Sequence, residues 1–433
     1  YVVDKVTCQK GTTASWNYEE NSMKLSNIKT PDYCTINFKD GYSVSLSAGS
    51  TGTVSAPTTQ STGYNGTVSF TVTPASGYQN ILETNTCGGT LSGNTYTVSK
   101  VTSNKSCSIK FKMPTLAEKL LANNPTIKTR TSFNTTFTET NTGTLYKATE
   151  SIANSPAKDV YYFAGDAKNN WVKFAGFYWR IIRTNHDGSI RLLYSGTSPD
   201  TISGYIGTSA FNSTFNDPMY VGYMYGTRGF QANNRTNENS STIKTYIDNW
   251  YSTNLSSYSK YISTEAVYCN DREVGEGTYT YPADSTFYYA TYTRLDTNKT
   301  PIYNCTNIKD AFSGSNVEAK LTYPIGLMTA DEIAYAGGKS FTVLPSPYAW
   351  FYTNSLKNDI TGSLFWWLIS PYCWDGHDVS LVWVVLGSGY PGRLNYGGVN
   401  DEYGVRPVIS IKADAQWSSG DGSPENPYKI IYN

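Results

Sequence analysis

The chain has 433 residues, which is enough for two or three domains with substantial cores. Its formal net charge is +0 at neutral pH, so no overall field attracts nucleic acid or an anionic membrane. No run of about 18 apolar residues is present, which excludes a membrane-spanning helix. Charged residues make up only 16% of the chain while 37 residues are tyrosine, a composition that favours a β-rich extracellular protein over a cytosolic enzyme.

Seven cysteines indicate disulfide bonds rather than a metal site. None lies in a Cys-x-x-Cys motif, and His186 and His377 are the only histidines, so we predict no zinc or other metal and no cofactor. Well-spaced cysteines favour export, and the first residue, Tyr1, suggests a targeting segment that has been removed or lies outside this sequence. An odd number leaves one cysteine unpaired. The seven are Cys8, Cys34, Cys87, Cys107, Cys269, Cys305 and Cys373.

The N-terminal part contains a partial internal repeat. The stretch "VTCQKGTTASWNYEENSMKLSNIKTPDYCTINFK" (6–39) aligns with "NTCGGTLSGNTYTVSKVTSNKSCSIKFK" (85–112). Each copy runs from a Cys through a Gly-Thr turn and an alternating strand to a second Cys and another strand. The repeat predicts the disulfides Cys8–Cys34 and Cys87–Cys107, each stapling a small β unit with a thin core. We expect a partial β unit at 1–40 and a β-repeat domain at 41–113.

The second copy has two leading strands, "GYSVSLS" and "GTVSFTVTP", that the first copy lacks. The segment "YVVDKV" at the N-terminus therefore has two interpretations. It is either an ordinary edge strand of its own unit, which we favour, or a strand that pairs with the open edge of a neighbouring subunit. The second interpretation would allow self-assembly through N-terminal strands.

A short helix and a linker are predicted at 114–145. In "MPTLAEKLLANNP" (113–125), Thr115 and Glu118 form a capping box, and Asn124-Pro125 ends the helix. The Thr- and Asn-rich run 126–145 is typical of a linker. From residue 146 the composition becomes rich in aromatic residues and stays so, which predicts one large domain at 146–433.

The sequence of this large domain predicts two strands, then two helices and an irregular β region. The stretch "GFYWRIIRTNHDGSIRLLYSG" (176–196) predicts two strands joined by a turn at His186, and helices are predicted at 241–251 and 329–338. A Trp-rich β region containing "SLFWWLISP" follows, and "GVRPVISIK" is the last strong strand. The predicted fold class is α+β multidomain, with small all-β N-terminal units before a C-type-lectin-like domain of two helices and an irregular β region.

Catalytic and nucleotide-binding motifs are absent from the sequence. It contains no GxSxG, P-loop, HExxH, dinucleotide-binding fingerprint or EF-hand loop, and two histidines restrict acid–base schemes. Asp421 and Glu425 in "GDGSPENPY" could bind calcium, but a polar surface turn is the favoured interpretation because no regular spacing of oxygen ligands is present. Aromatic stretches lack interleaved basic residues, which argues against nucleic acid. We predict that the protein is not an enzyme.

Several stretches resemble one bacterial family: "NNWVKFAGFYWRIIRTNHDGSIRLLYSG", "YVGYMYG", "YPIGLMTADEIAYAGG", "FWWLISP" and "YGVRPVISIK". The family comprises secreted proteins with a C-type-lectin-like domain, distantly similar in fold to formylglycine-generating enzyme. Some members are targets of diversity-generating retroelements, which rewrite adenines in one coding segment. The resemblance covers roughly 146–433. It does not extend to the catalytic cysteines of the formylglycine-generating relatives, so that activity is not transferred.

Diversification by adenine rewriting restricts which residue types can occur in the rewritten segment. Asn-type codons rewritten at adenines become NNY codons, which never encode Trp, Met, Gln, Lys or Glu. Across 375–403 the only residues of that excluded set are Trp383 and Glu402. We also predict the disulfide Cys269–Cys305, which leaves Cys373 as either a product of such a codon or a buried free thiol beside Trp374.

The resemblance implies a binding surface at 372–403. In diversified relatives, variable side chains project from a rigid scaffold as in an antibody paratope, where Tyr supplies contact area and small polar residues supply hydrogen bonds. We assign Trp366, Trp367, Trp383, Arg406 and Pro407 to the scaffold, with Arg406 tying the loop down through hydrogen bonds. The predicted ligand-binding residues are Asp375, His377, Asp378, Ser380, Tyr390, Arg393, Asn395, Tyr396, Asn400, Asp401 and Tyr403.

The leading hypothesis is a secreted or cell-surface bacterial binding protein, an adhesin or receptor-like display protein. Its ligand would be an unknown protein or glycan on another cell, a phage or a host surface, with no nucleic acid and no membrane span in this chain. The alternative is a pilin-like subunit of a surface filament that polymerises by exchange of N-terminal strands and displays the lectin-like domain. The binding hypothesis predicts that Tyr390, Arg393, Tyr396 and Tyr403 are exposed and gathered on one face.

Overall fold

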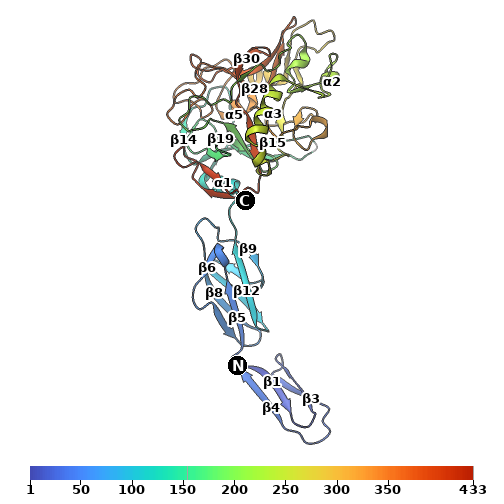
Figure 1. The fold of residues 1–433 in the computed structure, drawn as a ribbon, viewed down its shortest axis with the longest axis vertical. Coiled ribbons are helices and arrows are strands. Elements are labelled where there is room, and N and C mark those ends of the chain that lie inside the picture. Colours follow the sequence, from blue (N-terminus) through green and yellow to red (C-terminus); the bar gives the residue numbers. More distant parts are fainter. Residues whose placement is uncertain (154, 433) are drawn as a thin grey trace. The chain divides into compact units, whose positions relative to one another are not determined.

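The computed structural model describes residues 1–153 and 155–432 and divides the chain into two compact units, Tyr1–Pro114 and Thr115–Asn433. We call these unit 1 and unit 2 and describe each by itself (Figure 1). Strand residues make up 38% of the chain and helical residues 13%. The protein is therefore mostly β with a few helices, in agreement with the prediction of small β units.

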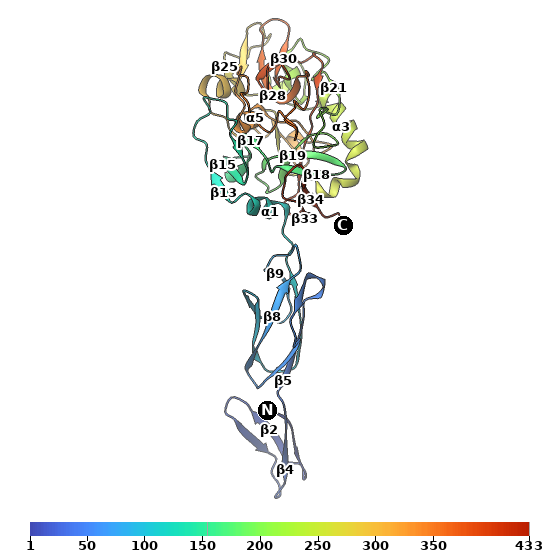
Figure 2. The ribbon, with the colours of Figure 1, turned by 90° about the vertical axis from the view of Figure 1, so that its left-hand side faces the viewer.

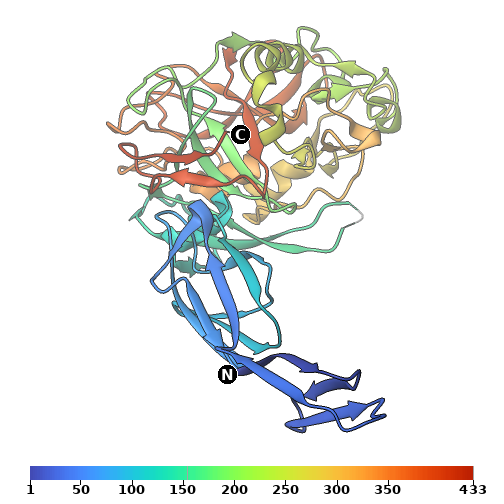
Figure 3. The same ribbon diagram turned by 60° about the horizontal axis from the view of Figure 1, so that its bottom comes forward.

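Residues 1–39 of unit 1 form two antiparallel strand pairs (Figure 3). The first strand pairs with the fourth, so "YVVDKV" lies within its own unit, the simpler of the two predicted arrangements. Among residues 1–39, Val2 is the only fully buried side chain. The strands are β1 (Val2–Cys8), β2 (Thr13–Asn17), β3 (Ser22–Ser26) and β4 (Cys34–Lys39).

Residues 41–112 of unit 1 form two four-stranded sheets, ordered β10-β11-β8-β6 and β7-β5-β12-β9. Alternate residues of β8, namely Val68, Phe70 and Val72, are buried, as expected for strands with one face on a core. The strands are β5 (Tyr42–Ser47), β6 (Gly52–Val54), β7 (Thr59–Thr62), β8 (Gly66–Pro74), β9 (Leu82–Asn85), β10 (Thr90–Ser92), β11 (Thr95–Val101) and β12 (Lys105–Phe111).

All three predicted disulfides are present: Cys8–Cys34, Cys87–Cys107 and Cys269–Cys305. Cys373 is the free cysteine, and it is buried. Three disulfides are typical of proteins from oxidising compartments outside the cytoplasm. In the part of the chain that the structure describes, no helix is long and apolar enough to cross a membrane.

The segment 115–145 belongs to unit 2 and is not a linker, so the boundary predicted at 146 is wrong. The predicted helix forms as α1 (Leu116–Asn123) with the Thr115–Glu118 capping box, and its buried leucines join the core of unit 2. The Thr- and Asn-rich run pairs twice in parallel, as β13 (Thr126–Lys128) with β15 and as β14 (Thr140–Asn141) with β17. The polar composition of this run suggested a linker. Composition does not reveal that its backbone pairs with strands further along the chain.

Unit 2 contains a nine-stranded sheet, with the path β13-β15-β16-β19-β18-β34-β33 and with β20 between β19 and β32. The predicted hairpin at 176–196 is confirmed as β19–β20, and β20 pairs with β32 of the predicted last strand. The further strands are β15 (Thr144–Glu150), β16 (Lys158–Tyr162), β17 (Asp166–Ala167), β18 (Trp171–Phe174), β19 (Phe177–Thr184), β20 (Ile190–Tyr194), β32 (Val408–Ile411), β33 (Trp417–Ser419) and β34 (Tyr428–Ile430).

A seven-stranded sheet carries the predicted binding segment (Figure 2). Its central strand is β28, of which all nine residues are buried, and β29 and β30 extend from it as successive antiparallel neighbours. The strands are β21 (Thr208–Ser209), β25 (Val274–Glu276), β26 (Phe287–Tyr289), β28 (Trp366–Trp374), β29 (Ser380–Val385), β30 (Leu394–Gly398) and β31 (Tyr403–Gly404).

Both predicted helices of this domain are confirmed, as α3 (Thr242–Asn254) and α5 (Ala330–Ala336). Ile243 and Ile247 of α3 are buried at the predicted spacing. Helix α5 starts with the Thr329–Glu332 capping box and ends at Gly337, whose φ of 123° favours glycine. Two shorter helices are α2 (Gln231–Asn234) and α4 (Ala290–Tyr292), the latter continued by a π-helical turn over Thr293–Asn298.

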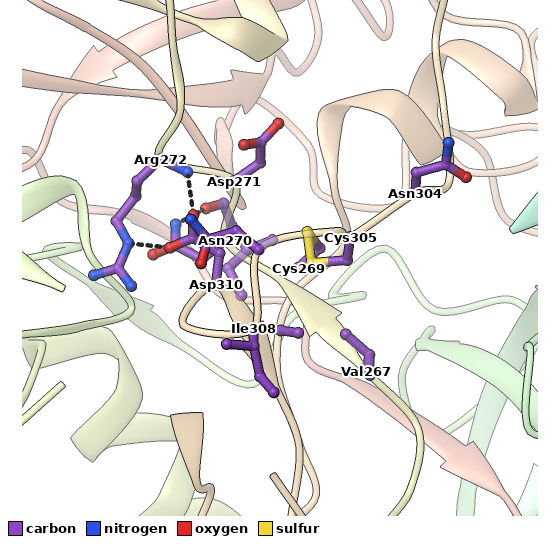
Figure 4. Close-up of a disulfide and its surroundings, with 12 residues drawn as sticks. Val267, Cys269, Asn270, Asp271, Arg272, Asn304, Cys305, Ile308 and Asp310 are labelled. Carbon is purple, nitrogen blue, oxygen red and sulfur yellow. Dashed lines mark hydrogen bonds and ion pairs between the residues drawn. A yellow bond between two sulfur atoms is a disulfide. The ribbon is translucent and has the colours of Figure 1, made fainter. Parts of the chain in front are cut away.

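Buried ion pairs hold the loops of unit 2 around its disulfide. Beside Cys269–Cys305, Nε of Arg272 lies 2.7 Å from Oδ1 of Asp310, and both side chains are nearly inaccessible (Figure 4). Arg235 approaches the other oxygen of Asp310 at 3.1 Å. Burial raises the pKa of Asp310, and the two guanidinium groups oppose that effect by stabilising the carboxylate.

We predict that Asp310→Asn lowers the free energy of unfolding by about 3–5 kcal/mol, because it leaves the guanidinium group of Arg272 buried without a counter-charge, whereas Arg235 keeps its ion pair with Glu273. The matched control is Asp159→Asn, which breaks the exposed pair of Asp159 with Lys147 and should cost less than about 1 kcal/mol. Chemical denaturation of the whole chain measures both. Equal losses for the two variants would contradict the prediction.

Candidate ligand-binding surface

The predicted binding segment forms two turns and two strands beside β28. Ser380–Val385 (β29) pairs with β28 on one edge and with β30 on the other. Trp383 lies opposite Tyr396, and Val384 lies opposite Asn395. Because neighbouring residues of a strand point to opposite faces, Tyr396 and Asn395 are on different faces of this hairpin.

Most of the predicted contact residues are accessible to solvent. Ten of the eleven are at least partly exposed, and one is buried. The exposed ones are His377, Asp378, Tyr390, Tyr396, Asn400 and Asp401, and the half-buried ones are Asp375, Arg393, Asn395 and Tyr403.

Ser380 does not belong to the surface. It is fully buried, its hydroxyl donates to the carbonyl of Asp217 at 2.8 Å, and its N–H donates to the carbonyl of Phe215. The hydroxyl and the N–H of Ser380 thus attach β29 to the loop of Phe215 and Asp217, so Ser380 cannot contact a ligand. A small polar residue in a loop-like sequence suggested exposure, but the position is the first residue of an interior strand.

Tyr403 lies on the face opposite Tyr396, so the predicted gathering of four residues on one face is wrong for this member. Its ring packs against Phe365 and Trp367, with centroids 5.3 and 4.8 Å away. A Cβ on Gly397, the residue after Tyr396, would lie 2.4 Å from the Tyr403 ring. Burial raises the pKa of the Tyr403 phenol, which donates to Asp401. Tyr403 is therefore part of the support for the surface.

Two predicted aspartates shape the turns. Asp375 Oδ1 accepts the N–H groups of His377, Asp378 and Val379 at 2.9–3.1 Å. Burial opposes ionisation of Asp375, but these backbone donors outweigh it and lower the pKa of the carboxyl. Asp401 closes the other turn by accepting the N–H of Gly398 at 2.9 Å. Their carboxylates are largely used within the chain.

An aromatic platform occupies the Tyr396 face. We define it as Tyr288, Tyr292, Phe341, Tyr372 and Tyr396. Tyr396 stacks on Tyr372 with centroids 4.3 Å apart, and Tyr288 stacks on Tyr292 at 4.2 Å. Tyr372 meets the rings of Tyr288 and Tyr292 edge-on, and Phe341 meets Tyr396 in the same way. Such stacked and edge-on contacts stabilise a fixed arrangement of rings.

A guanidinium group lies at the margin of the platform. The Arg393 guanidinium is 5.6 Å from the centroid of Phe341 and 5.8 Å from that of Tyr390. Among the described residues, no carboxylate is within ion-pair distance of Arg393. Tyr390 is 52% exposed and Tyr396 is 42% exposed, so aromatic area and an uncompensated positive charge are both available to a ligand.

Sequence reasoning missed four members of the platform: Tyr288, Tyr292, Phe341 and Tyr372. They come from α4 and its preceding strand, from the loop after α5, and from β28. One local signal was available for two of them. Tyr288 and Tyr292 are only four residues apart, on either side of the start of α4, so their contact with each other is local. Their proximity to Tyr396 depends on long-range sheet pairing.

The predicted scaffold residues are buried. Trp366, Trp367 and Trp383 are each at most 1% exposed. Arg406 is fully buried, donates to the carbonyl oxygens of Tyr194 and Phe351, and lies over the Trp366 ring. The prediction that Arg406 ties the loop down through hydrogen bonds is confirmed.

Cys373 belongs to β28, next to Trp374, and is 3% exposed. Burial, together with the nearby charge of Asp375, raises the pKa of its thiol to about 12. The thiol is therefore protonated at neutral pH and has little nucleophilic character.

The remaining sequence candidates have local partners. The His186 ring contacts the carbonyl of Pro156, and Asp421 accepts the N–H of Ser423 in a surface turn. Within residues 1–153 and 155–432, no group of three or more His, Cys, Asp or Glu side chains is placed to hold a metal ion. No family model, no curated protein and no solved structure matches the chain.

We predict that Tyr403→Ser and Tyr390→Ser have different effects on stability. Tyr403 packs against two rings of the scaffold, so its loss should lower the free energy of unfolding by about 2–4 kcal/mol. Tyr390 is exposed, and its loss should change stability by less than about 0.5 kcal/mol. Thermal or urea unfolding measures both variants. If Tyr403→Ser lowered the free energy of unfolding no more than Tyr390→Ser does, Tyr403 would not be a structural support of the surface.

Proposed function

We propose that unit 2 is a C-type-lectin-like binding domain of a secreted or cell-surface bacterial protein, and that its ligand lies on the aromatic platform beside Tyr390 and Arg393. One observation carries the proposal. Exposed aromatic side chains and a guanidinium without a carboxylate partner are gathered on one face of a sheet whose central strand is fully buried.

The chemistry of this face suits recognition of a protein or glycan. Tyrosine rings offer large contact areas at low entropy cost, and their hydroxyl groups can form hydrogen bonds at the edge of an apolar contact. Arg393 adds a cation that can pair with an acidic group or lie against an aromatic ring of the ligand. An adhesin or display protein needs such a contact surface and no catalytic group.

The codon content of the exposed residues is compatible with a diversified surface. Tyr390, Arg393 and Tyr396 are all residues that NNY codons encode; of the two residues in 375–403 that such codons cannot encode, Trp383 is fully buried and Glu402 is exposed. A near-copy of codons 372–403 beside the gene, differing only at adenines, would establish diversification. Without such a copy, the surface is that of an ordinary lectin-like domain.

The second candidate function is a subunit of a surface filament. Its support is the small β units with open strand edges in residues 1–39. Against it, β1 pairs with β4 of the same unit, so this strand is already engaged. Detection of "YVVDKV" inserted into a neighbouring subunit would establish the filament, and a monomer at all concentrations would contradict it.

We predict that the triple variant Tyr390→Ser, Arg393→Ser, Tyr396→Ser binds at least about 100-fold more weakly than the parent to a glycan array or cell surface that the parent binds. The reason is that the residues that dominate binding energy in interfaces are enriched in Tyr and Arg. The folded scaffold should be retained, because none of the three side chains is fully buried.

The matched control is Phe230→Ser. Phe230 is an aromatic residue of unit 2 that is 59% exposed, and its ring contact is with Tyr281 rather than with the platform. Its loss should leave binding unchanged. Equal binding by the triple variant and the parent would show that the platform is not the ligand site.

A further inference from the structure

Residues 1–39 repeat the second half of residues 41–112 strand by strand. β1 and β4 correspond to β9 and β12, which also pair antiparallel, and the hairpin β2–β3 corresponds to β10–β11. The registers agree. Val6 lies opposite Ile36, two residues from the cysteine of each strand, and Asn85 lies opposite Ile109 at the same distance from Cys87 and Cys107.

The backbone conformations agree as well. Asn27 and Lys100 each lie seven residues before the second cysteine of their copy. Their φ angles are 57° and 54°, in the left-handed region that side chains other than glycine seldom adopt. The two segments therefore share one fold, and the alignment places Met23, Leu25, Ile28, Cys34, Ile36 and Phe38 of the first copy on apolar residues of the second.

The two copies differ in what covers their apolar residues. In residues 41–112 six aligned positions are at most 3% exposed: Tyr96, Val98, Val101, Cys107, Ile109 and Phe111. None of their counterparts in the first copy is buried: Met23, Leu25, Ile28, Cys34, Ile36 and Phe38. Three of these are at least 40% exposed, with Phe38 at 57% where Phe111 is at 0%. Such an apolar face is costly to leave in water.

The complete copy shows what belongs on this face. Its β12 pairs in parallel with β5, and its β11 pairs antiparallel with β8. Val44 and Leu46 of β5 and Val68, Phe70 and Val72 of β8 fill the core against the six positions. Residues 1–39, all of which the structure describes, contain no counterpart of β5–β8. Two-stranded pairs without a covering sheet are marginally stable in water.

We propose that residues 1–39 are the second half of a β unit of the same kind as 41–112, completed by a four-stranded segment with the pattern of β5–β8 that lies directly ahead of them in the same polypeptide. The strand order of the complete copy favours this source, because β8 leads into β9 through the seven residues 75–81. A second copy of the chain offers no free equivalent, since its own β5–β8 already fill the core of its own 41–112.

The test adds the missing half to the whole chain. A copy of residues 41–79 joined ahead of Tyr1 preserves the seven-residue connection, since Val3 aligns with Leu82. Hydrogen exchange at Ile36 and Phe38 should slow at least about tenfold relative to the 433-residue chain, towards the rates at Ile109 and Phe111. The control is the same extension carrying Val44→Asp and Phe70→Asp in the added copy, which should give no slowing.

A second variant keeps the test decisive. Phe38→Ser should leave the unfolding of the 433-residue chain unchanged and should lower the unfolding temperature of the extended chain, because Phe38 becomes part of a core only there. Slow exchange at Ile109 and Phe111 in each sample verifies that the rest of unit 1 is folded. The proposal would be overturned if exchange did not slow in the extended chain. It would also be overturned if exchange at Phe38 in the 433-residue chain were slow and depended on protein concentration, which would indicate that a second copy covers this face.

Discussion

The carboxylate of Glu332 is the constraint on which the rest of unit 2 depends. Its Oε1 lies 3.0 Å from Nε of Arg183 on β19 and 2.7 Å from Nε of Arg191 on β20, and all three side chains are almost completely buried. Its Oε2 accepts the N–H of Thr329 at the start of α5. One carboxylate therefore fixes a helix against the hairpin of the larger sheet. If it were lost, Arg191 would be buried without a charge partner, whereas Arg183 would keep its ion pair with Glu150.

From α5 the arrangement extends to the candidate binding surface. The hydroxyl of Ser370 accepts the N–H of Ala330, the first residue of the helix, at 3.0 Å, and the N–H of Ile369 donates to the carbonyl of Met328. Ser370 lies in β28, two residues before Tyr372 of the platform. A chain of buried contacts thus connects the charge network to Tyr372, the buried ring on which the exposed Tyr396 stacks. Rings held in this way lose little further freedom when a ligand binds.

Local features of this protein could be predicted from the sequence, and long-range ones could not. The capping boxes at Thr115 and Thr329 and the hairpin at 176–196 depend on neighbouring residues, and the internal repeat identified two disulfides. The place of 115–145 in unit 2 depends on parallel pairing with strands that lie further along the chain. Composition carries no information about such pairing.

The candidate surface shows the same division. The residues of 375–403 suggested a contact surface, and Tyr390 and Tyr396 are exposed. The side chains of Ser380 and Tyr403 point away from the surface, whereas those of neighbouring residues point towards it. Sequence composition does not show this, because a shift of one position along a strand moves a side chain to the other face. Tyr288 and Tyr292 reach the platform only through the pairing of β26 with β28, which residues 375–403 do not reveal.

The physical demands of the sheet also limit how diversification could act. The NNY criterion admits Val, Leu and Ser, so by itself it does not separate surface positions from core positions. Val382, Val384, Leu394 and Val399 satisfy it and are fully buried, and polar or oversized residues there would destabilise the sheet. Exposed positions tolerate the whole codon set, since most substitutions there change stability little. A segment rewritten without loss of fold must therefore place its adenines at codons for one face of the hairpin and its turns, the face on which Tyr390, Arg393 and Tyr396 lie.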